Sequence, residues 1–217
     1  MKMNVNAKVK INIIVWVVIA LSIIGTIFIY PSLPEQIPIH WNVKGEVDNY
    51  GGKSSAFLTA LMPLIIAVLL IVIPRVDPRR DSYKKHQKAY EIVVNVLLVF
   101  FVFIHWATLG AALGHQINIG LFVGIAVGIL FIIIGNYMGQ IRHNYTFGIR
   151  TPWTLANEQV WQKTHRFGKW VFIISGVLFI INGIVANTIV FITSIVYLIG
   201  SLIYLFLYSY LEFRKLQ

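Results

Sequence analysis

Two polar segments interrupt an otherwise apolar chain, and they hold most of the side chains that could do chemistry. The first spans residues 31–55, where three prolines and several glycines keep the backbone out of a helix. Aromatic rings beside polar groups on a stiff loop are typical of a recognition surface. The alternative is a compact cap whose Trp41 and Tyr50 rings lie among lipid headgroups. The candidate recognition residues are His40, Trp41, Asn42, Asp48 and Tyr50.

Residues 37–42 of this segment are expected to form a short strand, because β-branched and aromatic side chains lie between turn-forming stretches. We expect turns at residues 43–46 and 48–52, which are rich in Gly, Asp and Asn. His40 has no partners at ligand spacing, so the sequence predicts no metal site.

The second polar segment spans residues 135–169 and combines amide, hydroxyl, guanidinium and indole groups. From residue 154 onward, apolar side chains recur at spacings of three and four, which predicts a helix capped by Thr154 or Asn157. One interpretation is an interfacial helix whose arginines face lipid phosphates; the other is a surface for a partner. The candidate residues are Asn136, Arg142, Asn144, Gly148, Arg150, Thr151, Pro152, Trp153, Trp161, His165 and Arg166.

Catalysis has little support in the sequence. Motifs for a serine nucleophile, a zinc protease or a phosphate-binding loop are absent, so we expect no catalytic site and no cofactor. None of the eight acidic residues lies within an apolar stretch, and His105 is the only ionisable side chain that does. Proton- or sodium-driven transporters usually carry several ionisable groups within their spans. With His105 alone there, we expect neighbouring helices to provide its hydrogen-bond partners rather than a proton relay.

Composition indicates which elements position these segments. Of 217 residues, 58% are apolar and 12% are charged, whereas soluble domains carry about 25% charged residues. The chain also has no cysteine, which excludes disulfides and thiolate chemistry. The sequence therefore predicts an integral membrane protein.

The apolar stretches predict an all-α, polytopic membrane protein with six transmembrane helices. The two longest stretches exceed one bilayer crossing and must each fold back, at residues 114–118 and 182–188. We divide the chain into a two-span unit, residues 1–90, and a four-span unit, residues 91–217. The expected spans are 11–30, 56–74, 92–113, 118–138, 170–186 and 188–210.

The charges predict the orientation. Apart from Lys44 and Lys53, all 18 Lys and Arg residues lie at the termini, in loop 75–90 or in segment 135–169. Basic loops stay in the cytoplasm, so both termini are expected there and loop 31–55 outside. The net charge of +10 is then a topology signal rather than a nucleic-acid-binding surface, and we expect loop 75–90 to be solvated.

A stripe of small residues runs along the fourth predicted span. Gly120, Gly124 and Gly128 recur every four residues. Such spacing lets two helices pack closely in a membrane, either within one chain or between two chains of an oligomer.

Both polar segments resemble known sequences. The run from Pro34 to Asn42, followed by Gly45, Asp48, Tyr50, Gly51 and Lys53, resembles a small membrane domain of uncharacterised role. The run Gly148-Ile149-Arg150-Thr151-Pro152-Trp153-Thr154-Leu155, followed by Trp161, Thr164, His165 and Arg166, resembles the SdpI family, which are immunity proteins against a sporulation-delaying peptide toxin. The two resemblances cover roughly residues 13–60 and 120–210.

The resemblance implies protection of the cell from a secreted, membrane-active peptide. It also implies signalling, in which the toxin-bound protein holds a winged-helix autorepressor at the cytoplasmic face of the membrane. The expected partners are therefore the peptide, this repressor and membrane lipids, with no direct nucleic-acid contact. Two alternatives stay open: a transporter of lipids or small molecules, and an enzyme that binds lipid headgroups through Arg142, Asn144, Arg150 and His165. In the enzyme, His165 would be the acid/base, with Glu158 as its one carboxylate partner.

Overall fold

The structure is a computed structural model that describes residues 9–217. Six helices in this range are long and apolar enough to cross a membrane, which confirms the predicted fold class. Lys2 and Lys8, which contribute to the predicted orientation, lie outside the described residues. The helices are α1 (Ile13–Ile29), α2 (Ser55–Val76), α3 (Ser82–Lys85), α4 (Gln87–Ala112), α5 (Ile119–Met138), α6 (Pro152–Ala156), α7 (Glu158–Val185) and α8 (Thr188–Arg214).

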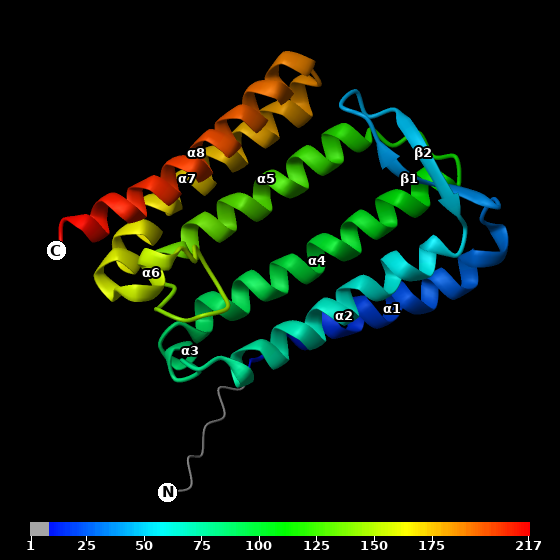
Figure 1. Cartoon of the computed structure of the whole chain (residues 1–217). Helices are drawn as coiled ribbons and strands as arrows, with labels where there is room; N and C mark the ends of the chain where they lie inside the picture. Colours follow the sequence, from blue (N-terminus) through cyan, green and yellow to red (C-terminus); the bar gives the residue numbers. More distant parts are fainter. Residues whose placement is uncertain (1–8) are drawn as a thin grey trace, which may run out of the picture.

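The six long helices lie side by side, with α1 and α2 at one edge, α4 and α5 in the middle, and α7 and α8 at the other edge (Figure 1). The short helices α3 and α6 lie at one end of this bundle, which we call the basic end. The start of α1 and the end of α8 lie there too, as six crossings require. The cytoplasmic location of this end stays a prediction from the charge pattern.

A two-stranded antiparallel hairpin covers part of the opposite end, which we call the hairpin end (Figure 1). Strand β1 (Gln36–Trp41) agrees with the prediction, and the expected turn at residues 43–46 follows it. The predicted turn at residues 48–52 is wrong, because these residues form strand β2 (Val47–Gly52). Pairing with β1 gives hydrogen-bond partners to the backbone N–H and C=O groups of this Asp-, Asn- and Gly-rich sequence. In isolation, such a sequence would satisfy those groups in a turn.

The base and the tip of the hairpin contact different helices. Leu33 and Ile37 are buried against Ala56 of α2 and Leu109 of α4. At the tip, Gly45 adopts a positive φ of 79° and lies against the backbone of Gly120 at the start of α5. The hairpin therefore reaches from the α2–α4 side of the bundle to α5.

Glycines bring α5 and α7 into close contact. An added Cβ at Gly124 would lie 2.6 Å from the Cα of Gly183, and one at Gly128 would lie 2.5 Å from the carbonyl oxygen of Gly176. The stripe of small residues is therefore occupied within one chain. Of the two alternatives for Gly120, Gly124 and Gly128, packing within one chain is the one observed: Gly124 and Gly128 face α7, and Gly120 faces the hairpin tip.

His105 joins α1, α2 and α4 inside the membrane-spanning part of the bundle. The ring is fully buried; its Nε2 lies 2.9 Å from Thr26 Oγ1 and its Nδ1 2.9 Å from Thr59 Oγ1. Both hydroxyls also lie within hydrogen-bond distance of a carbonyl of their own helix, that of Ser22 for Thr26 and that of Ala56 for Thr59, and each ring nitrogen has a threonine hydroxyl as its partner. The prediction of a satisfied, bundle-facing histidine is confirmed.

The fifth span differs from its predicted bounds. Instead of an interfacial helix followed by a span at residues 170–186, α7 is one continuous helix from Glu158. The side chains of Val160, Trp161, Thr164 and Val171 are buried against the protein rather than laid on a membrane surface. Asn157 caps α7 by accepting from the backbone N–H groups of residues 159 and 160, as expected for one of the two predicted caps.

We expect Gly128→Ala to lower the stability of the α5–α7 pair. The new methyl would overlap a backbone oxygen and Ile180 Cγ1 at 2.4 Å, and such overpacking costs about 1–3 kcal/mol. Gly200→Ala is the matched control, since a Cβ there meets nothing within 4 Å. Thermal unfolding of the purified proteins in detergent measures both, and equal midpoints would contradict the packing described.

Candidate functional site

A cavity of about 620 Å³ lies beneath the hairpin tip, between the hairpin and the ends of α5, α7 and α8. Its volume falls within the roughly 300–1,000 Å³ that is usual for ligand sites. Helix residues supply an apolar wall that includes Val123, Val127, Phe179 and Phe191, with the amide of Asn182 among them. Because the wall is apolar and the hairpin is polar, the cavity suits an amphipathic ligand.

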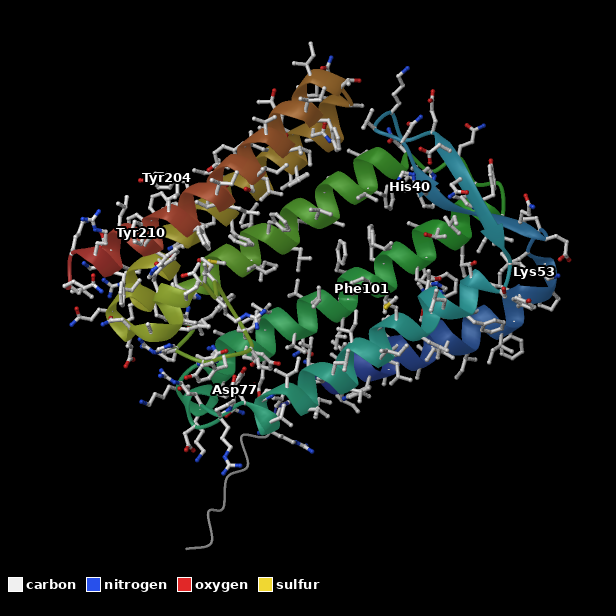
Figure 2. The ribbon with its side chains drawn as sticks, viewed as in Figure 1. His40, Lys53, Asp77, Phe101, Tyr204 and Tyr210 are labelled. Atoms are coloured by element: carbon white, nitrogen blue, oxygen red, sulfur yellow. The ribbon has the colours of Figure 1, made fainter. Side chains whose placement is uncertain are left out.

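Four of the five residues that the sequence predicts for recognition line this cavity: His40, Trp41, Asn42 and Asp48. His40 Nδ1 lies 2.5 Å from Asp48 Oδ1 across the hairpin, and both side chains are largely exposed. Figure 2 shows His40 at the hairpin end, close to the end of α5. Tyr50 is exposed on β2 and is not among the lining residues.

Asn42 shapes the hairpin turn as well as lining the cavity. Its Oδ1 accepts from the backbone N–H groups of Lys44 and Glu46, and its Nδ2 donates to Glu46 Oε2 at 2.9 Å. These bonds fix the turn that presents Trp41 on one side and Asp48 on the other.

A second group of polar side chains is buried at the basic end and is centred on Asp77 (Figure 2). Asp77 Oδ2 accepts from Thr146 Oγ1 at 2.7 Å, from the Tyr145 backbone N–H at 3.0 Å and from the Tyr83 hydroxyl at 3.3 Å. Asp77 Oδ1 accepts from the Arg79 N–H at 2.6 Å. The carboxylate thus joins the loop after α2 to the loop between α5 and α6.

Asn144 holds the second of these loops in shape. Its Oδ1 accepts from the N–H groups of Thr146 and Phe147, and its Nδ2 donates to the carbonyls of Arg142 and Phe147. All four hydrogen-bonding positions of the side chain are used inside the protein. Asn144 is therefore a structural residue of the loop.

Trp161 and His165 fasten the same loop to α7. Their rings stack with centroids 4.1 Å apart, and Trp161 Nε1 donates to the Ile141 carbonyl. His165 Nδ1 donates to the Trp161 carbonyl and Nε2 accepts from the Ile149 N–H. Gly148 has a φ of 112°, and a Cβ there would lie 2.5 Å from His165 Nε2, so only glycine fits.

The Thr-Pro-Trp-Thr run forms the corner that leads into α6. Thr151 is extended, as its position before Pro152 predicts, and its side chain forms a capping box with Thr154. Thr151 Oγ1 also lies 2.9 Å from Ser209 Oγ, and Trp153 packs against Phe206 and Tyr210. The run therefore joins α6 to α8. Thr154 belongs to the capping box of α6 and does not cap α7, so this one of the two predicted caps is wrong.

The remaining predicted residues face outward. Arg142, Arg150 and Arg166 are exposed at the basic end, and Asn136 is exposed near the end of α5. Arg150 NH1 donates to the Tyr145 carbonyl at 3.0 Å. The second predicted segment thus separates into a buried part that folds the loop and an exposed basic part.

These positions argue against the predicted headgroup-binding cluster. Asn144 and both ring nitrogens of His165 form hydrogen bonds within the protein, while the side chains of Arg142 and Arg150 are exposed. The four groups do not converge on a common ligand. In the described part of the chain, no group of three or more His, Asp or Glu side chains could hold a metal ion.

The prediction of a solvated loop at residues 75–90 is wrong for its central residues. Asp77, Tyr83 and His86 are buried, because they pack against the α5–α6 loop. Burial lowers the pKa of His86 to about 4, and it also lowers the pKa of His143 together with the nearby Arg79 guanidinium. Both rings are therefore neutral at pH 7.

Sequence reasoning missed the residues that complete the two groups. Asp77 is an acid in an otherwise basic loop, directly after an apolar span, and that contrast was a usable signal. Asn182 is a polar amide inside an apolar stretch, and from the sequence it is expected only as part of the turn between the last two spans. The apolar cavity wall carries no such signal, since any transmembrane helix contains similar residues.

The fold and both groups define a six-helix, multi-pass membrane protein with a hairpin cap at one end and a folded polar loop at the other. The profile of the SdpI/YfhL protein family matches residues 140–209, and that of a domain of unknown function, DUF1648, matches residues 17–73. Immunity protein SdpI of Bacillus subtilis (strain 168) is 30% identical over 172 residues, which cover 78% of this chain and 79% of that protein.

The chain therefore belongs to the SdpI/YfhL family and is a multi-pass protein of the cell membrane. Both resemblances seen in the sequence are confirmed. No solved structure matches the chain.

We expect Asp77→Ala to destabilise the basic end by at least about 2 kcal/mol, because it leaves four donors without their acceptor. Asp81→Ala is the control, since Asp81 is exposed and ion-pairs with Lys84 on the surface. Thermal unfolding in detergent and protease cleavage within residues 139–150 measure the effect. A midpoint for Asp77→Ala equal to that of the control would refute the assigned role.

Proposed function

We propose that this protein is a membrane immunity protein that captures a secreted, membrane-active peptide in the cavity beneath the hairpin. The relationship to an immunity protein over most of the chain supports the general role. The observation that carries the specific proposal is that four of the predicted recognition residues of the hairpin and an apolar wall from three helices surround one cavity. This cavity lies at the end that the charge pattern predicts to face outside.

The lining of the cavity suits a peptide that inserts into membranes. Phe179, Phe191 and Val127 offer apolar surface to a hydrophobic side chain, and Trp41 adds an aromatic surface from the hairpin. His40 and Asp48 at the polar side supply a hydrogen-bonding pair for the backbone or a cationic group. A peptide held there would be kept from the bilayer, and this is the protective effect.

The two alternative functions receive less support. A transporter coupled to protons or sodium needs a titrating group along its path, and His105 is bonded to two threonines in a packed bundle. A lipid-modifying enzyme needs the four headgroup-binding side chains to converge, and they do not. The immunity role therefore agrees best with the arrangement of side chains.

We expect Trp41→Ala to weaken peptide binding about tenfold or more, because loss of a buried aromatic anchor costs at least 1–2 kcal/mol. Tyr50→Ala is the matched control, since this ring lies on the same hairpin but outside the cavity. The measurement is survival of sensitive cells that express each variant, together with peptide binding to the purified proteins. If Tyr50→Ala loses protection while Trp41→Ala keeps it, capture occurs elsewhere on the hairpin.

We also propose that the exposed basic part of segment 135–169 holds a winged-helix repressor at the membrane when the peptide is bound. Arg142, Arg150 and Arg166 are available there, whereas the buried residues of the segment are engaged in folding it. The two loops joined by Asp77 connect the ends of α2 and α5. Peptide binding against α5 at the hairpin end would act on this connection, as coupling between two sites requires.

We expect Arg150→Ala to preserve peptide binding and protection but to abolish recruitment of the repressor. Its guanidinium makes one hydrogen bond, to a carbonyl of its own loop, so the change should leave the fold intact. Imaging of a fluorescent repressor in cells with and without peptide provides the measurement, and Arg214→Ala is the control for loss of a basic charge at the same end. Unchanged recruitment in Arg150→Ala would reject the proposed surface.

A further inference from the structure

A second cavity, of about 380 Å³, lies at the basic end around the start of α4. Its lining includes Lys84, Lys85, His86 and Lys88, with Gln140 from the end of α5. The three lysines are exposed, and Lys84 shares its charge with Asp81 at 3.2 Å. Glu91 also lines the cavity, but its Oε1 already accepts from the Lys10 backbone N–H and from Gln87 Nε2.

The start of α4 adds further positive potential. This helix has 26 residues, and no side chain caps its first turn. The N–H groups of a first turn and the helix dipole attract anions at such an end.

His86 provides a buried hydrogen-bond donor beside the start of α4. The side chain is almost entirely buried, and its Nδ1 accepts from the Arg142 backbone N–H at 3.3 Å. The neutral ring must then carry its proton on Nε2, and this buried Nε2 has no hydrogen-bond partner. The nearby Ser82 carbonyl raises the pKa of the ring against the effect of burial, but Nε2 has no partner at hydrogen-bond distance and angle.

A buried N–H without an acceptor costs free energy, and this one lines a cavity whose other groups are mostly positive. Phosphate oxygens would satisfy the N–H, the lysines and the start of the helix together. The position along α4 indicates where the phosphate comes from. The uncharged stretch of this helix begins directly after Glu91, so the cavity lies at the level where lipid headgroups meet the first turn.

We propose that this cavity is a binding site for the phosphate of an anionic phospholipid headgroup, held by Lys85, Lys88 and the Nε2–H of His86 at the start of α4. Basic pockets beside membrane-spanning helices on the cytoplasmic side are known to bind such headgroups. The site is separate from the cavity beneath the hairpin and does not depend on the immunity role. Its effect would be to fix α3 and the start of α4 at the membrane surface.

Native mass spectrometry of the full-length protein in detergent tests the proposal. We expect the protein to retain phosphatidylglycerol in preference to phosphatidylcholine, and the double variant Lys85→Gln/Lys88→Gln to bind it about tenfold more weakly. The control is Arg166→Gln/Lys169→Gln, which removes the same charge from the same end of the protein on α7 and should bind like the unmodified protein.

Three results would overturn the proposal. If both double variants lose binding equally, the attraction is general to the basic end rather than local. If the protein retains phosphatidylglycerol and phosphatidylcholine equally, the cavity does not distinguish an anionic headgroup from a neutral one. If inorganic phosphate displaces the lipid or stabilises the protein as well as the lipid does, the ligand is a soluble phosphate. His86→Leu checks the buried donor separately, and binding equal to that of the unmodified protein would exclude Nε2 from the site.

Discussion

The burial of the Asp77 carboxylate is the interaction on which the basic end of this protein depends. An ionised carboxylate is expensive to bury unless donors replace its water, and here the donors come from two separate loops. The lipid-embedded middle of each helix satisfies its backbone internally and offers few polar groups for such contacts. Polar connections between the helices therefore concentrate at the two ends.

At the other end, the hairpin provides the corresponding connection. Its base is buried against α2 and α4, and its tip lies against the start of α5. The cavity exists because the tip reaches over α5 while α7 and α8 approach from the other side. A site at this place thus depends on three segments that are far apart in the sequence.

The spans and their order follow from the sequence because each apolar stretch has one physical solution in a membrane. The bounds of α7 did not follow, because the residues from Val160 to Gly168 carry a helical pattern that fits either a membrane surface or the buried face of a longer helix. Strand β2 was mistaken for a turn because Asp48, Asn49 and Gly51 favour turns locally, whereas pairing with β1 decides their conformation. The role of Asp77 depends on a loop more than sixty residues away, and no local pattern predicts that.

The run from Gly148 to Leu155 has a different meaning in the structure than in the sequence alone. Gly148, Thr151 and Thr154 make the turn and cap that seat α6 against α7 and α8. Arg150 is the exposed charged residue of the same run. A change in most of these residues would therefore act first on folding, and only the exposed arginines separate a partner contact from stability.

Capture of the peptide beneath the hairpin can be measured directly by cysteine labelling, because the chain itself contains no cysteine. Val43→Cys places a single thiol on an exposed residue that lines the cavity, and Tyr50→Cys places one on the same hairpin outside it. Each variant is labelled in intact cells with a membrane-impermeant maleimide, with and without peptide. We predict that both cysteines react from outside and that the peptide slows labelling at position 43 only. Equal labelling at position 43 with and without peptide would contradict capture in this cavity.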